Sequence, residues 1–245
     1  MNLDKLTDTE NLTLSRGSHI HKNEGTCVME AVAWLAGEPH SDKPQCTNFF
    51  IRNLMIEWND SLPSDGMRNK VLGPLLIHVV GTNQPQFDFE RSFILIDAMI
   101  REMIPFRLRT MKNYTFAEVL RRLPPIVDNY TRHHAQIELG NLSRLVNNSS
   151  TTFALLQKGY ALTFAHNPTV SDAKLSHDVN CCCGIFPSTP HRILTEGEVN
   201  LDEYNSIMTD LVMKLCLLSD GFNPERDLLL SYSKKVKSHN ELLTA

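Results

Sequence analysis

The stretch Gly17–Cys46 holds the residues of this 245-residue chain that are best suited to chemistry. Histidine, cysteine and carboxylate side chains bind transition metals, transfer protons and attack carbonyl carbons. Seven residues of these types in the stretch are the candidates, namely His19, His21, Cys27, Glu30, His40, Asp42 and Cys46. Three interpretations of this cluster follow: a metal site, a nucleophile, or buried thiols without a chemical role.

The first interpretation is a zinc site formed by Cys27 and Cys46 with His19 and either Glu30 or His40. Thiolates and imidazoles are the ligands of tetrahedral zinc, and the ion would fasten the loops on both sides of one helix. The spacing is not that of known zinc fingers, because no CxxC pair is present and a whole predicted helix separates the two cysteines. Zinc is the only cofactor that the stretch predicts.

The second interpretation is a cysteine-dependent hydrolase or transferase in which Cys27 is the nucleophile. Cys27 falls at the start of a predicted helix, where the helix dipole and the free N–H groups favour the thiolate. His19, His21 or His40 would then be its base. In the third interpretation Cys27 and Cys46 are buried thiols, since free cysteine behaves as a small hydrophobic residue.

One short helix must position most of these residues. Thr26 is a plausible N-cap, and Gly37 followed by Pro39 is a plausible end, so the sequence predicts a helix over 27–36. Val28, Ala31, Val32 and Leu35 form its apolar stripe. Cys27 and Glu30 lie three residues apart on a neighbouring stripe, which places Glu30 within reach of whatever Cys27 contacts.

Hydrophobic periodicity predicts a mainly α fold, an irregular bundle of about seven helices. The expected segments are 47–60, 64–81 with a kink at Gly73–Pro74, 87–103, 115–123, 126–146, 200–221 and 224–238. The segment 151–165 fits a helix or a strand, and 166–197, which contains Cys181–Cys183, is expected to be a long irregular loop. The predicted organisation is a flexible N-terminus over 1–16, a helical core domain over 17–150 and a C-terminal helical part over 151–245.

Composition narrows the classes of function. The net charge of −4 argues against a nucleic-acid-binding protein, which usually carries a basic excess. No apolar run is long enough to span a membrane, and the polar, acidic N-terminus has no features of a signal peptide. Six cysteines are too few for a disulfide scaffold in a chain of this length, so we expect reduced thiols and a location in the cytosol.

The motif CVMExVAWLAGExxSDxPxC, preceded by His19 and followed by Trp58–Asp60 and the LxxxVVGT of Leu75–Thr82, resembles a family of actinobacterial and bacteriophage proteins. The resemblance covers the N-terminal third well and the remainder poorly. The family has no known activity, and the resemblance implies an intracellular helical protein of bacterial or phage origin. Its signature residues here are His19, Cys27, Glu30, Gly37, Ser41, Asp42, Pro44 and Cys46.

These observations predict a non-enzymatic cytosolic helical protein that acts through contact with another protein. A structural thiol or metal knot of His19, Cys27, Glu30 and Cys46 would stabilise it. The alternative is the enzyme with Cys27 as nucleophile. No P-loop, HExxH, GxSxG or dinucleotide-binding motif points to another activity.

Overall fold

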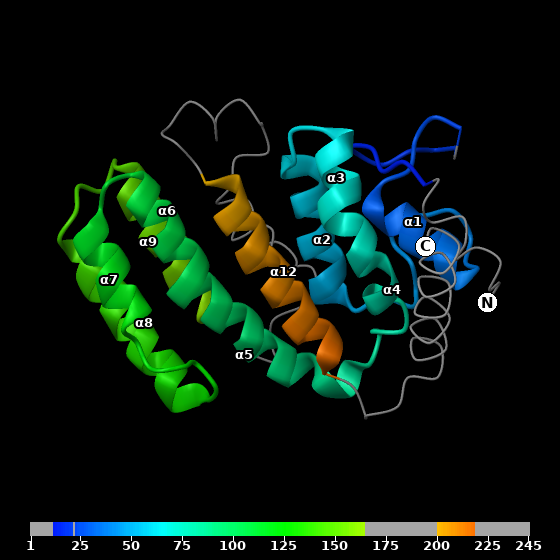
Figure 1. Ribbon diagram of the computed structural model, residues 1–245. Helices are drawn as coiled ribbons and strands as arrows, with labels where there is room; N and C mark the ends of the chain where they lie inside the picture. The colour runs from blue at the N-terminus through cyan, green and yellow to red at the C-terminus, as the bar shows by residue number, and fades with distance from the viewer. Residues whose placement is uncertain (1–11, 22, 165–199, 219–245) are drawn as a thin grey trace, which may run out of the picture. The chain divides into compact units, whose positions relative to one another are not determined.

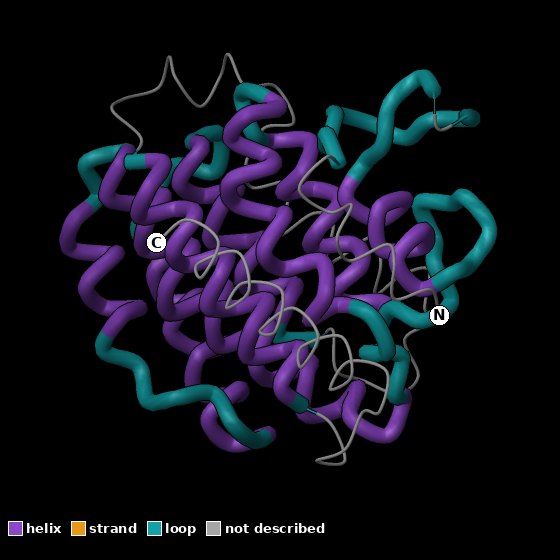
Figure 2. The backbone as a smooth tube through the Cα atoms, turned by 45° about the vertical axis from the view of Figure 1, so that its right-hand side comes forward, coloured by secondary structure: helices purple, strands orange, loops and turns teal. Residues whose placement is uncertain are grey.

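A computed structural model describes residues 12–21, 23–164 and 200–218, and the described residues form helices joined by loops, without a strand (Figures 1 and 2). The prediction of a mainly α protein is therefore confirmed. The chain divides at Pro85 and Leu215 into two compact units. Unit 1 contains the described residues up to Pro85 and those from Cys216 onward, and unit 2 is Gln86–Leu215. This boundary differs from the predicted one near residue 150, which lies inside unit 2.

Unit 1 is built on α1 (Val28–Ala36), which packs against α2 (Phe49–Ser61) and α4 (Leu76–Val79). α1 ends at Gly37, whose φ of 79° is the left-handed conformation that glycine adopts most easily. Seven of the nine residues of α1 are buried, which makes it the central helix of the unit. The prediction of a helix over 27–36 was therefore correct to within one residue.

The segment predicted as one kinked helix over 64–81 is interrupted where expected. α3 (Asp65–Leu72) begins after Ser64, whose side chain accepts a hydrogen bond from the Met67 backbone. Gly73–Leu75 is then a single 3₁₀ turn that leads into α4. Proline lacks the N–H that a continuous α-helix needs, so the tighter turn at Pro74 is its expected consequence.

Unit 2 begins with a helix longer than the predicted 87–103. α5 (Asp88–Ala98) continues through a π turn over Met99–Met103 into α6 (Ile104–Thr110). Pro105 lies in the first turn of α6, where its missing N–H costs no hydrogen bond, and the wider π turn before it lets the chain continue as a helix.

The other helices of unit 2 are α7 (Tyr114–Arg121), α8 (Asn129–Arg144), α9 (Thr151–Leu162) and α12 (Leu201–Leu217), which extends into unit 1 at its end. α8 packs along α9, and α6 packs on α7 and α9. The ambiguous segment 151–165 is thus helical over Thr151–Leu162. The predicted loop 166–197, the helix 224–238 and most of the N-terminal segment 1–16 lie outside the described residues.

Polar side chains fix the start of α8. Asp128 caps the helix by accepting a hydrogen bond from the Thr131 backbone at 2.8 Å. Asp128 and Arg132 are four residues apart on the chain, but the structure gives their side chains different partners. Arg132 instead donates to the Thr163 carbonyl at 2.5 Å, because capping has already oriented the carboxylate toward the helix backbone. Within the described part of the chain, no helix is long and apolar enough to cross a membrane.

Candidate functional site

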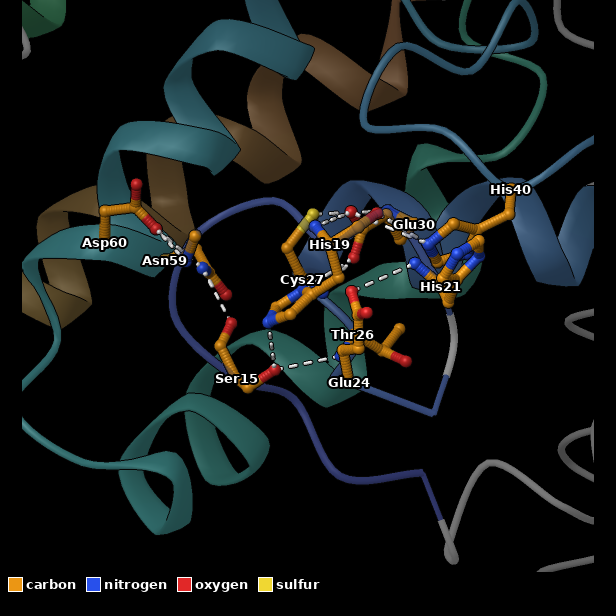
Figure 3. A network of polar contacts seen from close by, with 11 residues as sticks. Ser15, His19, His21, Glu24, Thr26, Cys27, Glu30, His40, Asn59 and Asp60 are labelled. Atoms are coloured by element: carbon orange, nitrogen blue, oxygen red, sulfur yellow. Dashed lines mark hydrogen bonds and ion pairs between the residues drawn. The ribbon is translucent and has the colours of Figure 1, made fainter.

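Glu30 is the centre of the polar network in unit 1 (Figure 3). Its carboxylate accepts hydrogen bonds from the His19 backbone at 2.6 Å, the Cys27 backbone at 2.7 Å and the His19 ring nitrogen Nδ1 at 3.0 Å. The side chain is only 1% exposed. We call Ser15, His19, Thr26, Cys27 and Glu30 the Glu30 knot, because these residues fasten the loop before α1 to the first turn of that helix.

The sequence folds in this way because Cys27 and Glu30 form a capping box. The Cys27 sulfur accepts the Glu30 backbone N–H at 3.4 Å, while the Glu30 carboxylate accepts the Cys27 backbone N–H. The N-cap is thus Cys27. The sequence had suggested Thr26 for this position. Thr26 is extended, and its N–H donates to the Ser15 hydroxyl at 2.9 Å. A glutamate three residues after the cap is the signature of this motif, with a thiol in the usual place of a hydroxyl.

The two ionisable groups of the capping box have pKa values shifted in opposite directions. Burial alone raises the pKa of Glu30, but the N–H donors of His19 and Cys27 outweigh it and hold this pKa below its ordinary value. Burial raises the pKa of the Cys27 thiol to about 12. The backbone N–H groups of the helix N-terminus lower the pKa of Cys27, as predicted, but desolvation outweighs them, so the net shift disfavours the predicted thiolate.

His19 links the buried carboxylate to a hydroxyl. A carboxylate only accepts hydrogen bonds, so the His19 Nδ1 that faces Glu30 carries the proton. The other ring nitrogen, Nε2, lies 3.3 Å from the Ser15 hydroxyl. Gly25 makes room for this pair, because a Cβ there would lie 2.4 Å from His19 Nε2 and 2.5 Å from Ser15 Oγ. The result is a hydroxyl–imidazole–carboxylate chain, which sequence reasoning missed because nothing in the sequence marks Ser15 as a partner of His19.

The remaining predicted ligands lie around the knot in different ways. His40 Nε2 donates to the His19 carbonyl at 3.0 Å, and the same nitrogen lies 3.8 Å from the Glu30 carboxylate. Cys46 belongs to a separate loop, where Glu38 accepts its backbone N–H at 2.8 Å. Burial raises the pKa of the Cys46 thiol to about 11. The His21 backbone N–H donates to Glu24 at an exposed position.

Of the four predicted metal ligands, the structure brings His19, Cys27 and Glu30 together by hydrogen bonds and gives Cys46 other partners, Glu38 and the Thr47 hydroxyl. Among the residues it describes, no group of three or more histidine, cysteine or acidic side chains is arranged to hold a metal ion.

α2 supports the loop that carries the knot. Asn59 donates to the Ser15 carbonyl at 3.0 Å, and Asp60 accepts the Gly17 N–H at 2.9 Å. From α3, Asn69 accepts the Leu14 N–H at 3.0 Å. Asn59 and Asp60, which lie in the segment Trp58–Asp60 named above, therefore hold the loop that carries Ser15 and Gly17.

Comparisons of the chain with protein-family models, with curated proteins and with solved structures find no match. The possible chemistry of the site is therefore inferred from the geometry of the site alone. A carboxylate whose oxygens are occupied by backbone and imidazole donors holds chain segments together. A protonated, buried thiol is a poor nucleophile. The Ser15 hydroxyl next to His19 is the one group of the knot in the arrangement that nucleophilic catalysis uses.

Proposed function

We propose that this is a non-enzymatic helical protein that acts through contact with a protein partner, and that the Glu30 knot is part of its scaffold. One observation supports this structural role. The oxygens of the buried Glu30 carboxylate accept hydrogen bonds from three N–H donors. A buried polar group of this kind is costly to disturb, since breaking it leaves an uncompensated charge. The free thiols Cys27, Cys46 and Cys216 support the predicted cytosolic location.

The contact surface that we propose lies on α8. Large apolar side chains on or beside this helix are exposed to solvent: Val127 by 67%, Tyr130 by 81%, Ile137 by 47% and Leu145 by 72%. Isolated exposed apolar residues are common, but a concentration on one helix is typical of interaction sites. This concentration contrasts with the knot, where Thr26, Cys27 and Glu30 are buried and Ser15 and His19 are half-buried.

A photo-crosslinking amino acid at position 137 tests the proposed contact. In a lysate of the cells that make the protein, we expect a crosslinked species from position 137 and none from position 122, whose arginine is exposed at the end of α7. A crosslink to a defined protein supports the proposal. The absence of any crosslink from position 137 under conditions that label other proteins would overturn it.

In another form of this proposal, a zinc ion is bound by His19, Cys27, Glu30 and Cys46 and stabilises the scaffold. An ion would have to replace N–H donors on Glu30 and deprotonate the two thiols, both of which are energetically costly here. Elemental analysis of the purified protein tests it, with Cys27→Ser and Cys46→Ser as variants. One zinc per chain that is lost in both variants supports the ion, and no zinc above background refutes it.

The hydroxyl–imidazole–carboxylate chain favours one second candidate, a serine-type hydrolase with Ser15 as nucleophile. It replaces the predicted enzyme with Cys27 as nucleophile, whose thiol has a pKa of about 12. A fluorophosphonate probe should then label Ser15 in the wild type and label neither Ser15→Ala nor His19→Gln. An unlabelled wild type excludes this enzyme, and iodoacetamide labelling of Cys27 no faster than of Cys46 excludes the other.

A further inference from the structure

A groove of about 350 Å³ lies between α8 and α9, and its lining includes Gly140 and Arg144 of α8 with Phe153 and Tyr160 of α9. This volume is at the lower end of the range for sites that receive a ligand or a large side chain. The groove has an aromatic wall, a glycine on its floor and a guanidinium at its rim. Among the described residues, Arg144 reaches only the Asn141 amide oxygen, at 3.5 Å, and no carboxylate.

Packing within the chain does not explain the glycine on the floor. In a helix interior, glycine is less stable than alanine by about 1 kcal/mol. At Gly159 of α9 there is a steric reason for it, since a Cβ would lie 2.6 Å from Ile104 Cδ1. At Gly140 the nearest atom to an added Cβ is Tyr160 Cε2 at 3.8 Å, which is ordinary contact. The space above Gly140 is therefore left open by the fold.

A large exposed side chain lies on the same face of α8 as this open space. Tyr130, Ile137 and Arg144 recur every seven residues, which is about two turns, and Gly140 lies between the last two. Tyr130 is 81% exposed, and its ring has no aromatic partner among the described residues. The helix thus carries an exposed side chain in its first turn, Tyr130, which we call the knob. Near its last turn it carries the open space above Gly140, which we call the hole.

We propose that α8 pairs in antiparallel orientation with α8 of a second copy of this chain, so that Tyr130 of each copy enters the Gly140 groove of the other. This inference rests on the proposed function and names the partner. A two-fold axis near residue 136 brings Tyr130 opposite Leu142 of the partner subunit, within half a turn of Gly140 and Arg144. The two Tyr130 contacts are then roughly 18 Å apart along the helices.

The charges on α8 support the same register. With the axis at residue 136, His134 lies opposite Glu138 of the partner subunit. No two like charges are opposed, and this pair occurs twice, as a closed two-fold interface requires. Tyr130 would also place its ring beside the Arg144 guanidinium, which is attracted to aromatic faces. A second copy is therefore the occupant that both the shape and the charge of this face select.

Sedimentation velocity of the full chain over a range of concentrations tests the pairing. We expect a wild-type dimer, and we expect Tyr130→Glu to raise the dimer dissociation constant more than tenfold, because buried tyrosines are frequent hot spots. Tyr114→Glu is the matched control, since Tyr114 is 62% exposed but lies on α7. It should leave the dimer unchanged. Tyr130 is exposed, so its replacement should leave the circular dichroism spectrum of the monomer unchanged.

A mixing experiment separates a specific knob-and-hole contact from general adhesion. Gly140→Leu fills the groove but keeps the knob, whereas Tyr130→Glu keeps the groove and removes the knob. Each variant alone should be monomeric, and their mixture should form a heterodimer through one intact contact. A wild type that stays monomeric up to about 0.5 mM, where even weak dimers associate, or a dimer that survives Tyr130→Glu, overturns the pairing. A crosslink from position 137 to a different protein would then leave the proposed function in place.

Discussion

Side chains have opposite surroundings in the Glu30 knot and beside the α8–α9 groove. Those of the knot are paired within the chain, whereas those beside the groove are exposed to solvent. In the knot, a 1% exposed carboxylate has three N–H partners and glycine at position 25 is required by the close approach of His19. The groove is lined by the exposed Arg144 and by Gly140, above which space is left open, and the same helix carries the exposed Tyr130 in its first turn. The comparison teaches that buried chemistry-bearing residues need not be the functional ones. A region with all its partners inside the chain has no bonding capacity left for a ligand.

The largest expected effect comes from Glu30→Gln. The glutamine has one oxygen for three N–H donors, and its own N–H₂ group faces other donors. We expect the free energy of unfolding to fall by about 3 kcal/mol, as for a broken buried ion pair or hydrogen-bonded charge. Urea unfolding measures it. Glu118→Gln is the control, because the Glu118–Arg122 pair is exposed and should contribute little. Equal effects of the two substitutions would contradict the contrast between the regions.

Protonation of Glu30 at low pH should also remove the charge that holds the knot together. We expect it to lower the free energy of unfolding by less than Glu30→Gln does. The pKa of Glu30 in the folded protein lies below its ordinary value of 4.5. A carboxyl with a lowered folded pKa stabilises the protein above the unfolded pKa, and this stability is lost as the pH falls toward the folded pKa. Below about pH 4.5 the free energy of unfolding of the wild type should therefore fall with a steeper slope than that of Glu30→Gln.

Besides the protonated Cys27 thiol, His19 and His40 are the ionisable side chains that face Glu30 among the described residues. A His40→Gln variant controls for the second imidazole in the same titration. If wild type and Glu30→Gln lose stability in parallel below pH 4.5, the carboxylate of Glu30 is not the group that holds the knot.

The sequence identified much of the knot but not its chemistry. The helix over 27–36, its end at Gly37 and the proximity of Cys27 and Glu30 follow from local spacing. The ion pair of Asp97 with Arg101 at 2.9 Å is also local, because the two residues lie four positions apart on one helical segment. The direction of the Cys27 pKa shift did not follow, because it depends on how deeply the tertiary fold buries the sulfur. Local periodicity does not encode this burial.

Contacts between distant segments were also beyond local reasoning. Ser15 reaches the knot through a loop, and Asp97 accepts the Ile126 N–H across 29 residues in addition to its ion pair. The predicted boundary near residue 150 rested on a weaker pattern in the C-terminal part, whereas α8 and α9 on either side of it pack together. Helix contacts, and not breaks in periodicity, define the units.

The two glycines of the α8–α9 pair give the smallest expected effects, and these have opposite signs. Gly159→Ala puts a methyl group 2.6 Å from Ile104 Cδ1 and 3.2 Å from Leu139 Cδ2, so crowding should outweigh the gain in helix propensity. We expect a loss of about 1 kcal/mol in the free energy of unfolding. Gly140→Ala meets nothing closer than 3.8 Å and should gain up to about 1 kcal/mol when measured on the monomer formed by Tyr130→Glu. Thermal unfolding of both variants in that background measures the difference. A destabilising Gly140→Ala would mean that the fold itself needs this glycine, and the argument that its open space serves a partner would lose its basis.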